Sequence, residues 1–531
     1  MSEEAPRQEA PRPFVYSWPF LLASAVVLPP VGLALLLMRR DLDAPLKAVG
    51  SLLIVLVGSL YVYLLFGSNS RPNTEAHFDA LERHRAEQRQ AAPPAEAAAA
   101  APVADAAAAP PAEGQPAAPA QSLVAPEAGA AGQPAAPAAA PAAARARRAY
   151  WTQFRGPGRD GRYEERAVNV SWPAGGLTPL WRQPVGGGFA SFSVADGVAY
   201  TIEQRRGQEV VAAYHVETGR ELWTHGWDAT FRDSTGDGPR STPTWDAGRL
   251  YALGATGELR CLDAKTGRAL WSKNILADNG ASNAPWGMAA SPLVVDDKVV
   301  VLAGGAGGKS VVAYNKTTGA RVWGALGDQA SYTSPMVVTL AGRRQVLAVT
   351  AARAAGIAPE DGAVLWEFPW SNSAGINISQ PVVVDQNRFF ISAGYGKGAA
   401  LVEVGGAGRS LTARAVWQNS SMKNKFNSPV IHEGHVYGLD EGILTCVEAA
   451  TGERKWKGGR YGYGQVVLAG GHLIVTTDGG EVVLVRATPQ AHTEVARFQA
   501  LDGQTWNNPA IADGRLLVRN GKEMACFKLA D

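Results

Sequence analysis

The sequence has little cysteine and almost no net charge. Three cysteines occur among 531 residues, at Cys261, Cys446 and Cys526, so a disulfide-dense scaffold is excluded. The 50 basic and 48 acidic side chains leave a formal net charge of +2. A chain with this balance offers no overall attraction for the phosphate backbone of nucleic acid. We therefore expect no nucleic-acid partner.

Metal-binding and phosphate-binding motifs are also missing. The 8 histidines show none of the spacings typical of metal sites, and His432 and His435 flank Glu433-Gly434, a pair typical of a hairpin turn. Glycine clusters at 304–308 and 394–398 could suggest phosphate loops, but each joins two expected strands and no helix follows. We predict neither a metal site nor a phosphate loop.

Long hydrophobic runs are confined to the N-terminal region. Val15–Met38 and Leu46–Phe66 are almost wholly apolar, each near the ~20 residues that a helix needs to cross a bilayer. After a short tail at 1–14, residues 15–66 are predicted to form two transmembrane helices. A cleaved signal peptide is the alternative for the first run, but Arg39-Arg40 follows it directly and no small-x-small cleavage site is present.

The charges beside these runs predict an orientation. Arg39, Arg40 and Lys47 lie in the short connection, and the positive-inside rule places that connection in the cytoplasm. The large C-terminal part would then face the periplasm, anchored in the inner membrane. A further group of arginines between positions 83 and 89 favours the opposite orientation if it is counted.

A change of composition marks residues 67–149 as a linker. After a stretch at 75–90 with helical character, the chain becomes alanine and proline with scattered Glu, Gly and Gln. Such a segment buries too little apolar surface to offset its ordering entropy, so we predict disorder. The linker could be a stalk that carries the C-terminal part away from the membrane, or a simple spacer.

A repeat governs residues 150–531. The segment 263–271, DAKTGRALW, recurs as HVETGRELW ending at Trp223, as NKTTGARVW ending at Trp323, as PEDGAVLW ending at Trp366 and as EAATGERKW ending at Trp456. The period is roughly 40–50 residues, which is typical of a repeat architecture. Between the tryptophans, a small polar residue before proline, as in Ser291-Pro292, precedes a strand, a turn and a second strand. Each repeat therefore predicts four antiparallel strands, which form one propeller blade.

Two counts predict eight blades. Inner strands begin near Ser191, Thr242, Ser291, Ser334, Gln380, Ser428, Val466 and Asn508. Outer strands carry an aromatic residue at Trp181, Trp223, Trp271, Trp323, Trp366, Trp417, Trp456 and Phe498. Because Trp181 precedes the first inner strand, we predict that Leu177–Val185 is the outer strand of the blade formed by Pro509–Leu529. The predicted fold is an all-β, eight-bladed propeller of four-stranded antiparallel blades, closed by an N-terminal outer strand.

The repeats resemble the PQQ-like β-propeller repeat family, within the quinoprotein alcohol dehydrogenase-like superfamily. The TGxxxW segments, the Ser-Pro strand starts and the eightfold count carry the resemblance, which covers about 150–531. The segment WTQFRGPGRDG from Trp151 is similar to the lead-in of many bacterial members. The family includes quinoprotein dehydrogenases and the non-enzymatic propeller lipoprotein of the outer-membrane β-barrel assembly machinery. The repeat is therefore specific for fold and not for activity.

The resemblance implies that the blade tryptophans, Trp181, Trp223, Trp271, Trp323, Trp366, Trp417 and Trp456, dock neighbouring blades. It also implies that a dehydrogenase would stack PQQ between a tryptophan and a disulfide of adjacent cysteines, beside calcium. No Cys-Cys pair occurs here. Cys261 and Cys446 occupy a repeat position that holds Ala213, Ala313 or Gly356 elsewhere, so we interpret it as a tight packing slot.

In a propeller, the loops from each outer strand to the next inner strand gather around one mouth of the central channel. These loops are rich in aromatic, arginine and amide side chains, which are typical of recognition surfaces. The candidate binding residues are Trp227, Arg232, Asp233, Asp237, Arg240, Asn279, Asn283, Trp286, Tyr332, Trp370, Asn377, Asn427, Tyr463 and Trp506.

Two functions follow as hypotheses. The first is a membrane-tethered binding or assembly scaffold with a protein or peptide partner. The second is a PQQ-dependent alcohol dehydrogenase, in which Asp233, Asp237 and the loop asparagines could hold calcium and supply a base. No residue matches a catalytic motif of the family closely, so we predict no catalytic residue and leave PQQ with calcium open.

Overall fold

The computed structural model describes residues 37, 43–62, 74–91 and 150–530. The chain divides into two compact units, Met1–Asp79 and Ala80–Asp531. The first unit contains α3, Ala44–Val62, which overlaps the second predicted membrane span. No helix in the described parts of the chain is long and apolar enough to cross a membrane. Almost all of the first predicted span and the linker at 92–149 lie outside the described residues.

The helix predicted at 75–90 is present as α4, Thr74–Ala91. It crosses the boundary between the two units, and its residues from Ala80 onward belong to the second unit.

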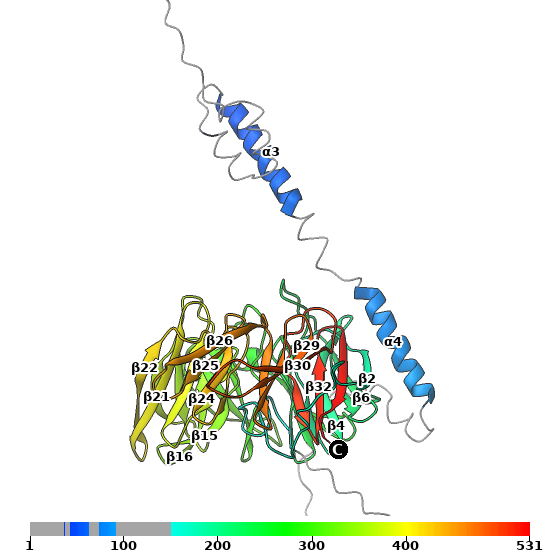
Figure 1. The fold of residues 1–531 in the computed structure, drawn as a ribbon. Coiled ribbons are helices and arrows are strands. Elements are labelled where there is room, and N and C mark those ends of the chain that lie inside the picture. The colour runs from blue at the N-terminus through cyan, green and yellow to red at the C-terminus, as the bar shows by residue number, and fades with distance from the viewer. Residues whose placement is uncertain (1–36, 38–42, 63–73, 92–149, 531) are drawn as a thin grey trace, which may run out of the picture. The chain divides into compact units, whose positions relative to one another are not determined.

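The second unit contains the predicted propeller, with four antiparallel propeller strands in each of eight sheets (Figure 1). The first four blades comprise β3 Ser193–Ala195, β4 Val198–Arg205, β5 Gln208–His215 and β6 Glu221–Asp228; β7 Thr244–Asp246, β8 Arg249–Leu253, β9 Glu258–Asp263 and β10 Ala269–Asn274; β11 Leu293–Val295, β12 Lys298–Gly305, β13 Lys309–Asn315 and β14 Arg321–Ala325; β15 Met336–Leu340, β16 Arg343–Val349, β17 Arg353–Ile357 and β18 Val364–Pro369. A short helix, α6 Ile275–Asn279, follows β10.

The remaining four blades complete the ring. They comprise β19 Val382–Val383, β20 Arg388–Ala393, β21 Gly398–Ala407 and β22 Ser410–Asn419; β23 Val430–His432, β24 His435–Asp440, β25 Ile443–Glu448 and β26 Arg454–Arg460; β27 Gln465–Ala469, β28 His472–Thr476, β29 Glu481–Arg486 and β30 Glu494–Gln499; β31 Ala510–Ala512, β32 Arg515–Arg519, β33 Glu523–Lys528 and β2 Pro179–Pro184. The hydrophobic core lies between neighbouring blades, where side chains of adjacent sheets pack together.

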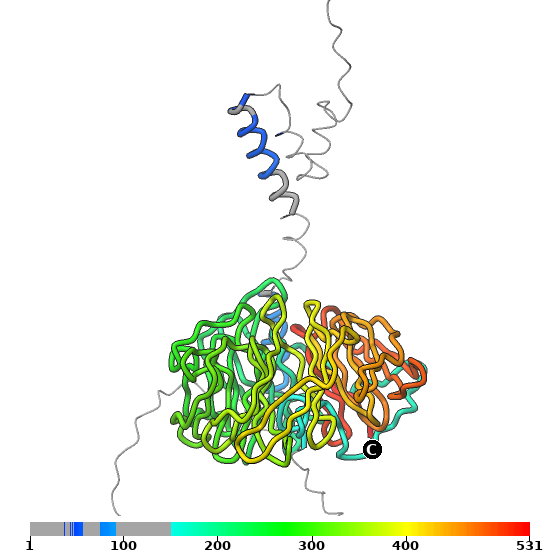
Figure 2. The backbone as a smooth tube through the Cα atoms, turned by 90° about the vertical axis from the view of Figure 1, so that its left-hand side faces the viewer, coloured from blue at the N-terminus to red at the C-terminus, as the bar shows by residue number. Residues whose placement is uncertain are grey.

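The last blade closes the ring as predicted. Strand β2 pairs antiparallel with β33, and Trp181 lies opposite Cys526. Figure 2 shows the cyan start of the propeller beside its orange and red final blades. Closure removes the exposed sheet edge that an open ring of blades would leave.

The recurring Thr-Gly and tryptophan pair is a joint between blades. The Trp223 indole N–H donates to the carbonyl of Ala264 in the next blade, at 3.1 Å. Gly267, in the turn of that blade, has φ +74°, and a Cβ there would lie 2.5 Å from the Trp223 ring. Glycine is therefore required twice, for the turn and for the approach of the indole. Trp366 differs, because its N–H donates to Gln345 Oε1 within its own blade.

The cysteine slot is also explained by this joint. Cys261, Cys446 and Cys526 each lie opposite a blade tryptophan across a strand pair. Ala213 lies at the same place, opposite Trp223. All three cysteines are free and buried. The slot is narrow because the indole lies over it, which favours small side chains.

The Ser-Pro starts of the inner strands link one blade to the next. The backbone N–H of Ser191 donates to Thr242 Oγ1, and that of Thr242 donates to Ser291 Oγ, both at 2.9 Å. The backbone N–H of Ser291 donates in turn to Ser334 Oγ at 2.9 Å. Gln380 then substitutes for the hydroxyl, accepting from the Ser334 N–H at 3.1 Å. The small polar residue is thus an acceptor for its neighbour in the ring.

The lead-in segment that starts at Trp151 passes inside the propeller and then pairs with one of its inner strands. Strand β1, Arg162–Tyr163, pairs parallel with the inner strand β27. Between Trp151 and β1 the chain places Arg155 and Arg159 inside the ring, where they are 0% and 1% exposed. Both have positive φ, 60° and 55°, an uncommon conformation for a residue with a side chain.

These guanidinium groups bind the inner strands of many blades. Arg159 donates to the carbonyls of Ser291 at 3.0 Å and Pro335 at 2.8 Å, and also to that of Pro292. Arg155 donates to the carbonyls of Pro429 at 2.9 Å and Val466 at 3.0 Å. The lead-in segment therefore stabilises the inside of the ring, a role that the sequence did not predict.

Candidate functional site

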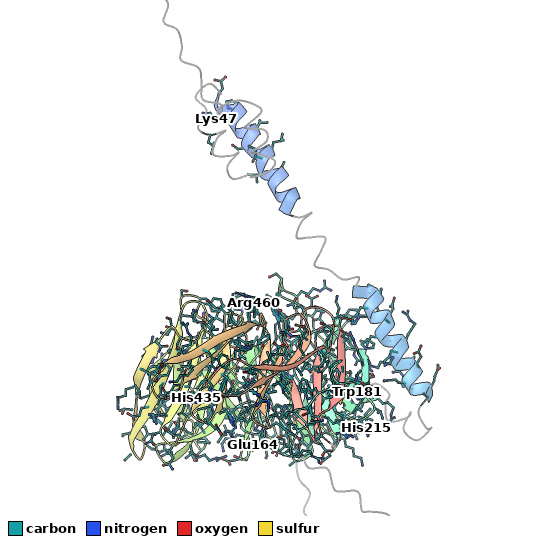
Figure 3. All side chains as sticks on the ribbon, in the orientation of Figure 1. Lys47, Glu164, Trp181, His215, His435 and Arg460 are labelled. Carbon is teal, nitrogen blue, oxygen red and sulfur yellow. The ribbon has the colours of Figure 1, made fainter. Side chains whose placement is uncertain are left out.

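The loops that follow the outer strands lie on one face of the propeller, which we call the loop face. Figure 3 shows Arg460, at the end of β26, on the face opposite to Glu164 of the lead-in segment. Half-buried aromatic and cationic side chains from loops around the propeller gather on the loop face. They are Phe189, Phe231, Arg240, Trp286, Tyr332, Tyr395, Lys425, Phe426, Tyr463 and Trp506, and we call this set the loop-face cluster.

Four rings of the cluster pack against one another. Trp506 stacks on Phe189 with ring centroids 5.9 Å apart and on Phe426 with centroids 5.2 Å apart. Tyr463 meets the edges of Phe426 and Trp506 at 4.9 and 5.5 Å. The loops before β3, β23, β27 and β31 therefore share one aromatic surface. Such surfaces offer large contact area with little side-chain entropy to lose on binding.

Lys425 lies over this surface. Its ammonium is 5.2 Å from the ring centroids of Tyr395 and Tyr463 and 5.5 Å from that of Phe426. It also donates to the Tyr463 hydroxyl at 3.4 Å. Within the described residues no carboxylate pairs with Lys425, whereas the nearby Lys423 pairs with Asp440 at 3.3 Å. Its positive charge is therefore available to a bound anion.

Arg240 forms a second cationic part of the cluster. Its guanidinium lies over Phe231 at 4.5 Å and over Phe189 at 5.2 Å, and it pairs with Asp233. Burial lowers the pKa of Arg240, and Asp233 opposes that effect. The predicted residues Asp233 and Arg240 thus act as a pair that orders their loop.

Trp286 and Tyr332 complete the neighbouring part of the cluster. Their rings meet edge to face with centroids 6.0 Å apart, and the backbone N–H of Trp286 donates to the Tyr332 hydroxyl at 3.3 Å. Burial raises the pKa of Tyr332. The hydroxyl therefore remains protonated at neutral pH and can also donate a hydrogen bond.

Two predicted site residues lie inside the scaffold. Trp227 belongs to strand β6 and not to a loop, because β6 continues to Asp228; it is 6% exposed and lies under Arg260 at 4.8 Å. Trp370 is fully buried and lies beside Phe368, with centroids 6.1 Å apart. Neither ring belongs to the loop-face cluster.

Three asparagines that were predicted as binding residues donate hydrogen bonds to backbone carbonyls of the fold. Asn279 ends helix α6, and its amide donates to the Ile275 carbonyl and the Tyr314 hydroxyl, both at 2.8 Å. Asn377 donates to Thr350 and Trp370 carbonyls, and Asn427 donates to the Leu439 carbonyl. Each of the three asparagines is 2% exposed. Their repeated occurrence in the loops reflects hydrogen bonding within the fold.

The other predicted residues lie at the surface. Arg232, Asp237 and Asn283 are exposed. The amide of Asn283 donates to the Ala255 carbonyl at 3.0 Å. These side chains border the loops that carry Arg240 and Trp286.

A buried acid lies behind the loop of Arg240. Glu209 is 0% exposed, and its Oε1 accepts from the Ala255 N–H at 2.8 Å. Its Oε2 has no hydrogen-bond partner among the described residues. Burial raises the pKa of Glu209 to about 7. Its position opposite Trp227, in the interior of the first blade, makes it a group that titrates near neutral pH inside the scaffold.

Five members of the cluster were not among the predicted site residues: Phe189, Phe231, Tyr395, Lys425 and Phe426. Phe189 precedes the first inner strand, as Trp506 precedes the last. Aligning the two repeats would therefore have identified Phe189 as a candidate site residue. Tyr395 lies in the hairpin between β20 and β21 with φ 55°. Hairpins between the second and third strands of a blade open on the same face as the loops, so Tyr395 lies beside Lys425.

The described residues do not fit the PQQ and calcium site that the resemblance implied. They contain no group of three or more His, Cys, Asp or Glu placed to hold a metal ion. The three cysteines lie in different blades opposite tryptophans, so no disulfide of adjacent cysteines can cover a quinone. Asp233, one of the two carboxylates expected to hold calcium, is paired with Arg240.

Comparison with known proteins agrees with the propeller repeat. The family model described as "Outer membrane protein assembly factor BamB" matches residues 206–458. The chain is 28% identical over 295 residues to outer membrane protein assembly factor BamB of Nitrosomonas eutropha, covering 46% of this chain and 67% of that protein.

Two dehydrogenases also match. The chain is 33% identical over 138 residues to quinohemoprotein alcohol dehydrogenase ADH-IIG of Pseudomonas putida. It is 29% identical over 134 residues to 1-butanol dehydrogenase (cytochrome c) of Thauera butanivorans. Each alignment covers 24% of this chain and 18% of the dehydrogenase. The resemblance of the propeller region to the PQQ-like, BamB-like repeat family is therefore confirmed, over the blades from β5 to β26.

Proposed function

We propose that this protein is a binding and assembly module, in which two membrane spans within residues 15–66 anchor a propeller that faces the periplasm. The loop-face cluster holds its protein or peptide partner. The observation that carries the proposal is the position of Lys425, a lysine over three aromatic rings with no ion-pair partner among the described residues. The match to an outer membrane protein assembly factor supports the same class of function.

The cluster favours a partner segment that carries both apolar and acidic groups. The stacked rings of Phe189, Trp506 and Phe426 offer an apolar platform. Lys425 adds a positive charge at its edge, which suits a carboxylate of the partner. Aromatic and cationic residues in a partly buried centre are typical of residues that dominate binding energy.

The proposal is tested by photo-crosslinking of the full chain in its own cells. A photoreactive phenylalanine analogue replaces Tyr463 in the cluster, and a matched control replaces Val364, an exposed residue of outer strand β18. We expect a defined protein adduct from position 463 and not from position 364. The adduct should weaken in a Lys425→Ala background and persist in Lys265→Ala, an exposed lysine of a Thr-Gly turn. Equal adducts from both positions, or none from 463, would contradict the proposal.

A PQQ-dependent dehydrogenase is the alternative, favoured by the 33% identity to a quinohemoprotein alcohol dehydrogenase over 138 residues. The described residues lack the group of carboxylates and the adjacent cysteines that the resemblance implies for this site, so the alternative rests on the sequence identity. The purified full chain is mixed with PQQ and calcium, and quinone absorbance and dye-linked alcohol oxidation are measured. Saturable binding together with oxidation would replace the scaffold proposal by the dehydrogenase.

A further inference from the structure

Part of helix α4 lies on the propeller at the seam where the ring closes. The seam is formed by β2 of the last blade and by β5 and β6 of the first, and we define it by Gln183, Pro184, Tyr214 and Glu221. The residues of α4 from Ala80 onward belong to the same compact unit as these strands. The helix thus contacts both partners of the ring closure.

Arg85 anchors the helix in the seam. It is 2% exposed, and its guanidinium lies 4.9 Å from the ring centroid of Tyr214. It donates to Gln183 Oε1 at 3.0 Å and to the Pro184 carbonyl at 2.9 Å, and it pairs with Glu221 at 3.3 Å. One side chain of α4 therefore binds β2 and β6 at once.

The contacts around Arg85 are polar as well. Gln88 donates to Gln183 Oε1 at 2.8 Å and accepts from the Glu221 N–H at 3.3 Å. At the surface, Glu82 pairs with Arg206 at 2.8 Å. Between Ala80 and Ala91, Leu81 is the only buried large apolar side chain. Leu81 is 1% exposed, so its burial adds an apolar contribution of about 1.5–3 kcal/mol to the charge-assisted hydrogen bonds of Arg85.

The charge network below the helix is balanced without Arg85. Arg205 pairs with Glu203 at 2.6 Å and with Glu221, and the buried Arg519 lies in the same network, so two arginines face two glutamates. Burial raises the pKa of Glu203, but Arg205, Arg519 and Arg85 outweigh burial and lower it to about 2. Because the network is neutral by itself, loss of Arg85 leaves no unpaired negative charge in the seam.

We propose that α4 is a releasable clasp, and that the seam is a helix-binding surface that takes an arginine-bearing polar helix, here α4 of the same chain. Residues 92–149 separate α4 from the propeller in the sequence, so the helix can leave without breaking a strand. Salt screens the exposed Glu82–Arg206 pair, whereas the Arg85–Glu221 pair, 2% and 6% exposed, is screened much less. Release exposes Gln183, Tyr214 and Glu221.

The proposal is tested by hydrogen exchange of the full chain in detergent, followed by mass spectrometry. A polar helix of 18 residues is marginal alone, so slow exchange between 80 and 91 reports docking. In Arg85→Ala we expect exchange of this segment to accelerate at least about tenfold, because a buried charged hydrogen-bond donor is lost. High salt should accelerate this exchange less than Arg85→Ala does, because it screens only the exposed Glu82–Arg206 pair, and β3–β6 and β31–β33 should keep their protection in both cases.

Arg89→Ala is the matched control, because Arg89 is exposed on the same helix. It should leave exchange unchanged. The clasp is refuted if Arg85→Ala leaves the helix protected, if the helix is unprotected in the natural chain, or if the seam strands lose protection together with it.

A second measurement tests the helix-binding surface. A labelled peptide of residues 74–91 is added to the full chain carrying Arg85→Ala, whose seam is open, and its anisotropy is followed. The natural peptide should bind at least about tenfold more tightly than the peptide with Arg85→Ala. Equal affinities, or no binding of either peptide, would exclude a seam that recognises the arginine.

Discussion

The inside of the ring and the loop face both hold cations, and they use them in different ways. Arg159 is 1% exposed and donates hydrogen bonds to carbonyls at the inner strands. Its guanidinium group therefore stabilises the fold and is not accessible to a partner. Lys425 is half-buried, lies over three rings and forms no ion pair among the described residues. The difference separates a residue that holds the blades together from one that can bind a partner.

The largest expected effect is on Arg159. Arg159→Met removes the donors of the Ser291 and Pro335 carbonyls, each loss costing about 1–3 kcal/mol, whereas the Pro292 carbonyl still accepts from Thr244 Oγ1. We expect the free energy of unfolding to fall by at least about 2 kcal/mol, measured by urea denaturation of the full chain. Arg232→Ala, an exposed arginine near the loop face, should change it by less than about 0.5 kcal/mol. Similar losses in both variants would remove the distinction between the two regions.

The next effect concerns the buried acid Glu209. Burial raises its pKa from 4.5 to about 7, so the folded state retains a proton that the unfolded chain has lost. Stability is therefore full below pH 4.5 and is lost as pH rises to about 7, with a total of about 3 kcal/mol. Glu209→Gln should abolish this pH dependence in thermal unfolding and stabilise the protein at alkaline pH. A pH profile unchanged by the substitution would show that Glu209 titrates normally.

A smaller effect on stability is expected at two turn glycines that differ in how closely their surroundings pack. Gly267 and Gly248 both have positive φ, but a Cβ would meet the Trp223 ring at Gly267 and nothing within 4 Å at Gly248. Gly267→Ala should cost about 2–3 kcal/mol and Gly248→Ala about 1 kcal/mol, measured by thermal unfolding. Equal costs would mean that the turn alone, and not the blade joint, requires glycine.

The smallest expected change in stability is at Lys425. Lys425→Ala should alter the free energy of unfolding by less than about 1 kcal/mol, because the side chain is half-buried. The crosslink from position 463 should nevertheless fall at least about tenfold, since losing the charge pair between Lys425 and a carboxylate of the partner costs at least about 1.4 kcal/mol of binding. A loss of stability as large as that of Arg159→Met would make Lys425 part of the scaffold.

The repeated residues allowed the fold to be predicted. Trp181 preceded the first inner strand, and this offset placed β2 in the last blade, as found. Positions that recur from blade to blade have similar neighbours in most blades, with Trp366 as an exception, so one sequence pattern describes most of the joints. The two arginines of the lead-in segment and the helix α4 are not part of the repeat. The repeat pattern therefore could not predict their contacts.

The site was harder to predict because loops do not repeat. Trp286, Tyr332, Tyr463 and Trp506 do lie in the loop-face cluster. Asn377 was predicted as a binding residue, yet its amide donates to the carbonyl of Trp370 in the same loop and to that of Thr350 after β16. Polar residues of tight loops serve the local backbone as often as a partner, and sequence alone does not distinguish the two uses.

One paired measurement tests the central claim most directly. Arg159→Met and Lys425→Ala are compared in the full chain, with unfolding free energy and the crosslink from position 463 measured for each, the crosslink under conditions where both remain folded. The loop-face account predicts that Arg159→Met loses stability and keeps the crosslink, whereas Lys425→Ala keeps stability and loses the crosslink. A crosslink that follows stability in both variants would contradict the account.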